Sequence, residues 1–306
     1  MRIIITGGTG LIGRALAESL ILDGHQVWIL TRNPSTAHIA ESAQGVYWDS
    51  RTTAGWNPLV SQMDAVVNLA GESLGSGPWT KVRKNRIISS RVEAGRAISS
   101  AILLTTQRPK VLIQASAVGF YGPHAAEPVT EDSPLGLGFL AEVCRDWEAS
   151  SQAVEAMGVR RVVVRTGVVL SKNADAFQRL MLPFRLFAGG PMGTGHQGFP
   201  WIHLADEVAA IRFLLDNNHA LGVFNLSAPE PLSNADFSRI LARVMQRPYW
   251  LPVPAFALRL LLGEMSALVL EGQYMLPKRL QELGFRFRFE NTELALRDLL
   301  VESSHL

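Results

Sequence analysis

The chain has 306 residues, 47% of them hydrophobic and 18% charged, so it is long enough to bury a large core in one elaborate domain or two modest ones. Its 29 basic and 27 acidic residues nearly cancel, which argues against nucleic acid or an anionic membrane as the main partner. The single cysteine, Cys144, rules out an intrachain disulfide and fits a reducing compartment.

The sequence predicts neither secretion nor a membrane span. The N-terminus enters an apolar run at once, without a basic leader or a cleavage site. The most apolar late segment, residues 255–270, carries Arg259 and Glu264 and is shorter than the roughly 20 residues that a bilayer needs. We therefore expect a cytoplasmic protein in which residues 255–270 form a packed amphipathic helix. Contact of this segment with a partner or a membrane surface is the alternative.

Apolar segments alternate with helical periodicity in chain order. The first strand, RIII, runs into the turn TGGTGLIG and an amphipathic helix. Further strands are expected at residues 26–32, 64–71, 110–117, 160–167 and 222–228, and long helices at about 82–104 and 139–157. This order predicts an α/β fold of the Rossmann type, with a doubly wound parallel sheet that binds ligands at the carboxyl ends of its strands.

The pattern loosens beyond residue 170 into glycine-rich loops and segments punctuated by proline. We expect residues 1–170, with 200–228 returning to them, to form the dinucleotide-binding domain. Residues 171–199 and 229–306 are expected to form a smaller C-terminal lobe that binds the substrate.

The turn TGGTGLIG, residues 6–13, is the first candidate site. It matches GxGxxG through Gly8, Gly10 and Gly13, and equally GxxGxxG through Gly7, Gly10 and Gly13. Glycines at these positions allow a tight turn, a close approach to a pyrophosphate and close packing of the helix. Because the motif follows a strand and opens a helix, it predicts dinucleotide binding at the helix N-terminus.

The end of the second strand indicates which dinucleotide is bound. Thr31 and Arg32 end this strand, and Arg32 lies 19 residues past Gly13, where an NAD site would place Asp or Glu for the ribose hydroxyls. A guanidinium can hold a 2′-phosphate with two hydrogen bonds, so the position favours NADP(H). A solvated loop arginine is the alternative.

Several motifs together carry a family resemblance. TGGTGLIG, NLAG, SAVGFYG, VVVRTGVVL, FPWIHLADEVA and FNLSAPEPLSNADF occur in the order seen in extended short-chain dehydrogenase/reductases. The segments NLAGE, LPFRL with GGPMGTGHQ, and FPWIH make the chain most similar to the atypical branch called epimerase family protein, or NAD-dependent epimerase/dehydratase. The resemblance covers nearly the whole chain. Some members of this branch carry a label related to cell division.

The resemblance implies a set of cofactor-binding residues. They are Thr6, Gly7, Gly10, Leu11, Ile12 and Gly13 at the pyrophosphate, Thr31 and Arg32 at the 2′-phosphate, Asp49 near the adenine, Asn68, Leu69, Ala70 and Gly71 along the adenosine side, and Arg165 at the end of a later strand. Asp49 could equally be a turn former, and Arg165 or Arg185 could hold an anionic group of a substrate.

The catalytic residues of the family are missing from this chain. The resemblance implies a Tyr with a Lys four residues later, as proton donor and ribose-binding cation. The corresponding helix reads GFLAEVCRDWEAS, with Phe139 or Leu140 at the Tyr position and Val143 or Cys144 at the Lys position. Apolar side chains transfer no proton, so the usual relay is absent.

Three other residues are candidates for the chemistry: Ser116, Tyr121 and His196. Ser116 is one place off the family's serine, whose position falls on Ala117, and it could instead be a strand-end turn residue. Tyr121 could reach the cleft or pack in the core, and His196 lies in a glycine-rich loop. His203 is read as a structural residue, because it follows an apolar run.

Two classes of function follow from these residues. The first is an NADP(H)-dependent oxidoreductase or epimerase acting on an unknown small molecule. The alternative is a catalytically inactive regulatory or binding protein that depends on NADPH, with a link to cell division. No metal site is expected, because the histidines are scattered. The two long helices allow a homodimer, and a protein partner is the other possibility.

Overall fold

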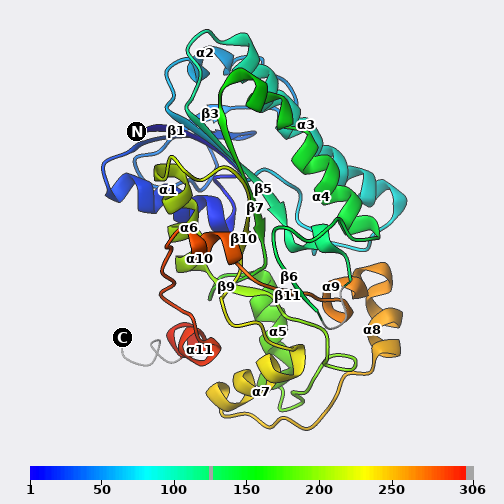
Figure 1. Ribbon diagram of the computed structural model, residues 1–306. Coiled ribbons are helices and arrows are strands. Elements are labelled where there is room, and N and C mark those ends of the chain that lie inside the picture. Colours follow the sequence, from blue (N-terminus) through cyan, green and yellow to red (C-terminus); the bar gives the residue numbers. More distant parts are fainter. Residues whose placement is uncertain (124–126, 301–306) are drawn as a thin grey trace.

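The computed structural model describes residues 1–123 and 127–300. Its centre is a sheet of seven parallel strands in the order β10-β7-β5-β4-β1-β2-β3 (Figure 1). These strands are β1 (Arg2–Thr6), β2 (Gln26–Thr31), β3 (Gln44–Tyr47), β4 (Ala65–Asn68), β5 (Val111–Ala117), β7 (Arg160–Thr166) and β10 (Gly222–Leu226). The predicted Rossmann-type fold is confirmed.

Helices cover both faces of the sheet (Figure 1). Helices α1 (Leu11–Leu22) and α6 (Leu204–Asp216) pack on one face, while α2 (Asn57–Val60), α3 (Lys81–Leu104) and α4 (Phe139–Ala149) cover the other. Successive side chains of a strand point to opposite faces, so Ile3 and Ile5 of β1 lie in the α1/α6 core, whereas Ile4 lies in the α2/α3 core. All three isoleucines are fully buried, which explains the unbroken apolar run RIII.

The strand order reverses between β1 and β4. From β1 the chain moves outward to β2 and β3, and then returns to the other side of β1 as β4. The loops that leave β1 and β4 at their carboxyl ends therefore diverge, and the crevice between them is where such sheets bind ligands. The glycine turn follows β1 and residues 69–71 follow β4, so both lie at this crevice.

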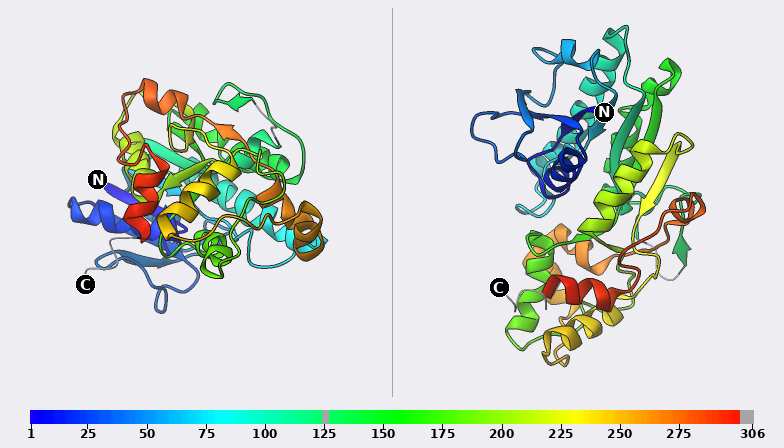
Figure 2. Two further views of the ribbon diagram at one scale, coloured as in Figure 1. Left: turned by 90° about the horizontal axis from the view of Figure 1, so that it is seen from below. Right: turned by 90° about the vertical axis from the view of Figure 1, so that its left-hand side faces the viewer.

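A second lobe lies below the carboxyl ends of the strands (Figure 1; Figure 2, right). Its core is formed by α5 (Asp175–Arg185), α7 (Asn234–Met245) and α11 (Thr292–Leu300), which bury Phe177, Phe184 and Phe237. Two short parallel strand pairs join it to the sheet domain. They are β8 (Val168–Leu170) with β9 (Trp201–His203), and β6 (Pro128–Val129) with β11 (Tyr274–Met275), the latter followed by α10 (Lys278–Glu282).

Two helix predictions differ from the structure. The helix expected at 139–157 ends at Ala149, and a 3-10 turn at Gln152–Met157 follows it. The single packed helix expected at 255–270 is wrong: Gly263 has a φ of +56° and separates α8 (Ala255–Leu262) from a 3-10 turn and α9 (Ala267–Leu270). No residue of α8 is buried. In the described part of the chain, no helix is both long and apolar enough to cross a bilayer.

Candidate functional site

The glycine turn after β1 leaves room for an anion at the start of α1. Gly7 has a φ of +69°, and a Cβ there would lie 2.6 Å from the Leu69 carbonyl oxygen. A Cβ on Gly13 would lie 2.3 Å from the Gly7 carbonyl oxygen, so only glycine lets α1 pack this closely on the turn. Among the described residues no side chain caps the N-terminus of α1 at Gly10, so the first backbone N–H groups of the helix have no side-chain acceptor.

The start of α1 also shows the role of two apolar residues in the predicted cofactor-binding set. Leu11 and Ile12 are half-buried and occupy the first turn of α1. Leu11 packs against the small-lobe core and Ile12 against the sheet core, so both fix the direction in which the helix N-terminus points. Their backbone N–H groups, not their side chains, are what an anion would contact.

Arg32 stands immediately after β2, on the far side of the glycine turn from β4. Its side chain is exposed, and no carboxylate pairs with it among residues 1–123 and 127–300. Thr31 ends β2, and its hydroxyl accepts a hydrogen bond from the backbone N–H of Asn33 at 3.4 Å. The guanidinium is therefore free to take an anionic group at this edge of the crevice.

Asp49 forms a turn after β3. Its carboxylate accepts hydrogen bonds from the backbone N–H of Arg51 at 2.9 Å and from the N–H and hydroxyl of Thr52 at 2.8 Å. These bonds lower the pKa of Asp49. These contacts are those of the turn-forming alternative.

A buried polar chain lies beneath the crevice. The Thr6 hydroxyl donates to Asn68 Oδ1 at 2.7 Å, and Asn68 Nδ2 donates to Gln114 Oε1 at 2.9 Å. These three side chains are fully buried, so they join β1, β4 and β5 to one another. The cofactor-binding surface predicted at β4 is then the backbone of Leu69, Ala70 and Gly71, with Gly71 exposed.

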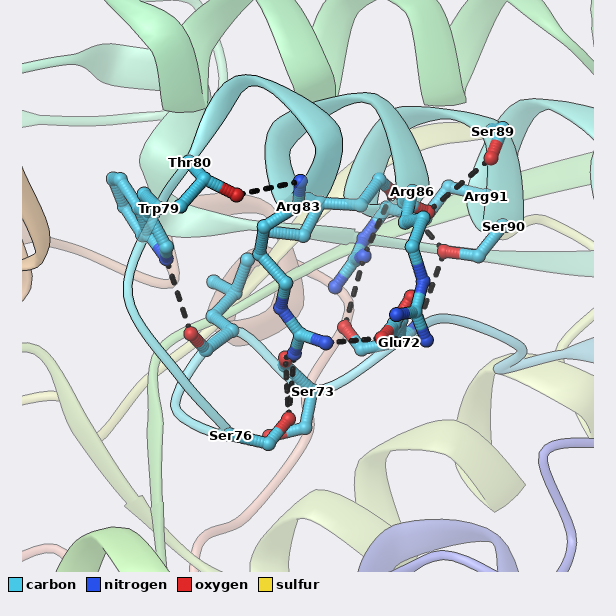
Figure 3. A network of polar contacts seen from close by, with 12 residues as sticks. Glu72, Ser73, Ser76, Trp79, Thr80, Arg83, Arg86, Ser89, Ser90 and Arg91 are labelled. Atoms are coloured by element: carbon cyan, nitrogen blue, oxygen red, sulfur yellow. Dashed lines mark hydrogen bonds and ion pairs between the residues drawn. The ribbon is translucent and has the colours of Figure 1, made fainter.

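The loop from β4 to α3 is held rigidly by arginines (Figure 3). Arg83 donates to the Glu72 carboxylate, to the Ser73 carbonyl oxygen and to the Ser76 hydroxyl, and Arg86 pairs with the same carboxylate at 2.9 Å. The hydroxyl of Thr80 caps α3. Two of the four basic residues at the start of α3, Arg83 and Arg86, thus hold this loop, whereas Lys81 is exposed and Lys84 pairs with Glu264.

Arg91 closes the back of the same loop. Its Nη1 donates to the carbonyl oxygens of Glu72 at 3.1 Å and Ile87 at 3.0 Å, and its guanidinium lies over the Trp147 ring at 4.9 Å. A Cβ on Gly71 would lie 3.1 Å from Arg91 Cζ, so the glycine lets this arginine approach the loop. Burial lowers the pKa of Arg91.

Ser116, Tyr121 and Arg165 come together in one buried network. Arg165 binds the Glu148 carboxylate with two hydrogen bonds of 2.8 and 2.9 Å, and the Ser116 hydroxyl donates to the same carboxylate at 2.6 Å. Arg165 Nη1 donates to the Tyr121 hydroxyl at 3.1 Å, which donates to Asn225 Oδ1 at 2.6 Å.

Burial sets the chemistry of this network. The exposed fractions of Ser116, Tyr121 and Arg165 are 3%, 0% and 4%, so none of them presents a surface to a cleft. Burial also raises the pKa of Tyr121, although Arg165 opposes the effect, so the phenol stays protonated. Of the two alternatives for Tyr121, the structure agrees with packing in the core, and it pairs the Arg165 guanidinium with Glu148.

Apolar side chains fill the helix face where the family would carry its Tyr and Lys. Val143, Trp79 and Ile87 form a buried cluster with Phe139, Leu140 and Met265 packed against it. Cys144 donates to the Ala117 carbonyl oxygen at 3.6 Å, and burial raises the pKa of its thiol to about 11. Neither these apolar side chains nor the Cys144 thiol can exchange a proton near neutral pH.

The two histidines of the small lobe differ in exposure. His196 is exposed, and its carbonyl oxygen accepts a hydrogen bond from the Tyr274 hydroxyl at 2.7 Å. The neighbouring Gln273 donates to the Gly122 carbonyl oxygen, so the His196 loop is tied to the end of β5. His203 is buried, accepts from the Ala205 N–H at 3.1 Å and packs on Phe289, as expected of a structural residue.

Sequence reasoning missed Glu148 and Asn225, which complete the network. Glu148 follows Leu140 and Cys144 at intervals of four residues on α4, so it lies on the helix face that packs against the sheet. A carboxylate on such a face predicts a buried cationic partner, and this signal was available from the sequence. Asn225 lies on β10 and carries no comparable signal.

The glycine turn, the crevice at the strand reversal and the free N-terminus of α1 define a dinucleotide-binding α/β protein. In the described segments, no cluster of His, Cys, Asp or Glu is suited to hold a metal ion. The family model described as "NAD dependent epimerase/dehydratase family" matches residues 3–227, and a second model, "Domain of unknown function (DUF1731)", matches residues 253–299. The chain belongs to the NAD-dependent epimerase/dehydratase family.

Relatives and solved structures agree with this assignment. The chain is 41% identical over 303 residues to epimerase family protein YfhF of Bacillus subtilis, covering 99% of both chains. It is similar to human epimerase family protein SDR39U1 solved with NADPH, with a TM-score of 0.87, 32% identity, and 98% and 99% of the two chains covered. The structure of Thermus thermophilus UDP-glucose 4-epimerase with NAD superposes on this chain with a TM-score of 0.76 and 18% identity, over 100% of both chains, so the two proteins share the fold.

Proposed function

We propose that the protein binds NADP(H) in the crevice between β1 and β4 and transfers hydride between this cofactor and a small molecule held under the C-terminal lobe. The observation that carries the proposal is Arg32, an exposed guanidinium just after β2 that pairs with no carboxylate of the described residues, at the position where a carboxylate would select NAD. The NADPH in the solved SDR39U1 structure, 32% identical to this chain, supports the same cofactor.

The residues present fit a dinucleotide. A Cβ at Gly10 would lie 3.3 Å from the Gly7 carbonyl oxygen, so the glycine keeps the turn at the start of α1 uncrowded where the pyrophosphate would lie. The free N–H groups of the first turn of α1 would hold the pyrophosphate, and Arg32 would hold the 2′-phosphate. The bound cofactor would supply or accept a hydride at its nicotinamide ring.

The chain's own groups then have defined tasks. The arginine-braced loop at Glu72–Thr80 and the backbone of residues 69–71 would form the wall against the cofactor. The apolar cluster around Val143 would exclude water from that wall. Proton transfer falls to His196, the only exposed group of the three predicted catalytic residues, while Ser116 and Tyr121 hold the ends of β5, β7 and β10 in register.

Calorimetric titration with NADPH and with NADH tests the cofactor. We expect NADPH to bind at least about tenfold more tightly, which corresponds to about 1.4 kcal/mol, and Arg32→Ala to remove the difference. Arg96→Ala, which removes an exposed arginine of α3, is the matched control and should keep the preference. Equal affinity for the two nucleotides in the unmodified protein would refute NADP(H) selectivity, and absence of binding would refute the cofactor site.

A second function, a binding or regulatory protein whose shape depends on NADPH, is favoured by one observation. The helix face at Phe139, Leu140 and Val143 is packed with apolar side chains instead of an acid and a base. NADPH oxidation in the presence of a panel of small aldehydes and ketones separates the two functions. Turnover that falls with His196→Gln supports the enzyme, whereas tight NADPH binding without turnover on any carbonyl supports the regulatory protein.

A further inference from the structure

The two lobes are joined firmly on the β7 and β10 side of the sheet. The chain itself crosses between them there, at the ends of β7, β9 and β10. The Ser227 hydroxyl, just after β10, donates to the Met275 carbonyl oxygen of β11 at 2.9 Å. The Asp206 carboxylate of α6 accepts from the backbone N–H of Phe289 at 2.9 Å, and Phe289 belongs to the small-lobe core. Both hydrogen bonds are buried and therefore costly to break, so this side is fixed.

Side chains join the lobes again on the β1 and β4 side. Arg179 of α5 reaches to the loop between β4 and α3, where its Nη1 donates to the Gly75 carbonyl oxygen at 3.2 Å. Glu264, in the 3-10 turn after α8, pairs with Lys84 in the first turn of α3. Both contacts join the small lobe to the sheet domain, so they bridge the two lobes away from the places where the chain crosses between them.

The contacts on this second side are weaker. Arg179 is exposed, and the side chain of Glu264 is 63% exposed. Exposed ion pairs and single hydrogen bonds contribute little to stability, because water competes for both partners. The apolar contacts here, Met265 against the cluster around Trp79 and Leu11 against the small-lobe core, are made by half-buried side chains. The lobes can therefore separate on this side at a small cost, while the other side keeps its buried hydrogen bonds.

The loop that Arg179 contacts is itself rigid (Figure 3). Arg83 binds the Glu72 carboxylate, the Ser73 carbonyl oxygen and the Ser76 hydroxyl, and these residues flank the loop tip at Gly75. A loop braced in this way does not follow a departing side chain. Breaking the contact at the loop tip then means that the small lobe moves away from the sheet domain as a body.

The same loop borders the proposed cofactor site. It begins at residues 69–71 after β4, where the Leu69 carbonyl oxygen lies so close to Gly7 that a Cβ on this glycine would be 2.6 Å away. From the glycine turn the loop runs to Gly75 and its contact with α5. The contacts of Arg179 and Glu264 therefore hold the small lobe against the wall of the crevice in which the cofactor would lie.

We propose, resting on the NADP(H) site proposed above, that the small lobe opens and closes over the cofactor crevice. The β7 and β10 side is the hinge, and the contacts of Arg179 with Gly75 and of Glu264 with Lys84 are the latch. NADPH enters and leaves while the latch is open, and the closed lobes shield the bound cofactor from water. Because the latch joins protein groups to one another, weakening it should speed both binding and release and leave the affinity nearly unchanged.

Distances between two nitroxide labels, measured by double electron–electron resonance, test the opening without any cofactor. The labels are attached through Ser73→Cys on the loop and Ala176→Cys on α5, which are both exposed, while the native Cys144 is buried. We expect two populations of distances, and adding Arg179→Gln should raise the ratio of the longer to the shorter at least about threefold. A single distance that Arg179→Gln leaves unchanged overturns the proposal.

Stopped-flow fluorescence of NADPH tests the gating. Arg179→Gln should raise the association and dissociation rate constants at least about threefold each and change Kd less than about twofold, and adding Glu264→Gln should raise both rate constants further. Arg297→Gln is the matched control, because this arginine of α11 is exposed and its partner Glu293 lies on the same helix. The control should leave both rate constants unchanged.

Two kinetic results overturn the latch. One is a pair of rate constants that Arg179→Gln leaves unchanged. The other is faster dissociation alone with a weaker Kd, because Arg179 would then hold the cofactor directly. Absence of NADPH binding by the unmodified protein would refute the proposed function instead, and the label distances would still decide whether the lobes open.

Discussion

Replacing Glu207 with glutamine should remove a steep pH dependence from the stability of this fold. Glu207 lies in the first turn of α6 and is 1% exposed. Its Oε1 accepts a hydrogen bond from the Thr166 hydroxyl at 2.8 Å, and its Oε2 has no partner among the described residues. Burial raises the pKa of this carboxyl from an ordinary 4.5 to about 8, because it removes the charged form from bulk solvent, and the hydrogen bond from Thr166 only partly opposes the shift.

The direction of the effect follows from the proton count. The unfolded chain loses the Glu207 proton near pH 4.5, whereas the folded chain keeps it up to about pH 8. Between these values the folded state holds one proton more, so the free energy of unfolding falls as pH rises. The fall is about 1.4 kcal/mol per pH unit and amounts to about 5 kcal/mol from pH 4.5 to about 8.

Guanidinium unfolding, followed by circular dichroism at several pH values in this range, measures the effect. The free energy of unfolding of Glu207→Gln, minus that of the unmodified protein, should rise by about 5 kcal/mol between pH 4.5 and about 8. Taking the difference cancels the other titrating groups that both proteins share, including His203 and Asp206.

Glu290→Gln is the control for the loss of one carboxyl, because Glu290 is exposed. Its difference from the unmodified protein should stay flat within about 0.5 kcal/mol over the same pH range. A flat difference for Glu207→Gln as well would refute the reasoning, since the carboxyl would then have to be hydrated or paired in the folded protein. A difference that falls with pH would show that the folded state stabilises the charged form.

Two further substitutions follow from the packing of the site. Glu148→Ala leaves the Arg165 guanidinium buried without a counter-ion, so the free energy of unfolding measured in urea should fall by about 3–5 kcal/mol. The control is Glu142→Ala, which removes an exposed glutamate of the same helix and should lower this free energy by less than about 0.5 kcal/mol. Gly13→Ala places a Cβ 2.3 Å from a backbone carbonyl oxygen of the glycine turn, so calorimetry should detect no NADPH binding. The control is Gly75→Ala, where a Cβ meets no atom within 4 Å; this variant should bind NADPH like the unmodified protein. Equal losses of stability in the two glutamate variants, or equal NADPH binding by the two glycine variants, would contradict the packing described.

The sheet could be predicted from sequence because its signals are local. The three buried isoleucines of β1 and the glycine turn that follows lie within a dozen residues, and most later strands of the sheet are also short apolar runs. The edge strand β3, QGVY, is not apolar and was not among the expected strands. Parallel strands buried on both faces need such runs, so the alternation with helices allows few other folds. The same locality made the glycine turn and Arg32 visible as candidate cofactor sites.

The roles of Ser116, Tyr121 and Arg165 could not be predicted in the same way. Whether these side chains are exposed or buried depends on Glu148 and Asn225, which lie on other elements and contact them only in the assembled sheet. A hydroxyl at a strand end looks the same in sequence whether it faces a cleft or a buried carboxylate. The exposed outer side of α8 was not predicted either, because an apolar sequence does not show which of its side chains are buried against the rest of the protein.

The buried network and the apolar cluster on α4 are two parts of one arrangement. Glu148 neutralises Arg165 and takes the hydrogen bond of Ser116, so the charged group of β7 and the hydroxyl of β5 both find their partner near the C-terminal end of α4. Val143 and Phe139 can therefore pack against Trp79 without burying an unpaired donor or acceptor. Restoring a tyrosine and a lysine on this helix face would place a phenol and an amine inside that cluster, so two substitutions alone would destabilise the fold rather than rebuild a proton relay. For the proposed enzyme we therefore expect proton transfer to come from the small lobe, where His196 is exposed and its loop is tied through Tyr274 and Gln273 to residues shortly after β5.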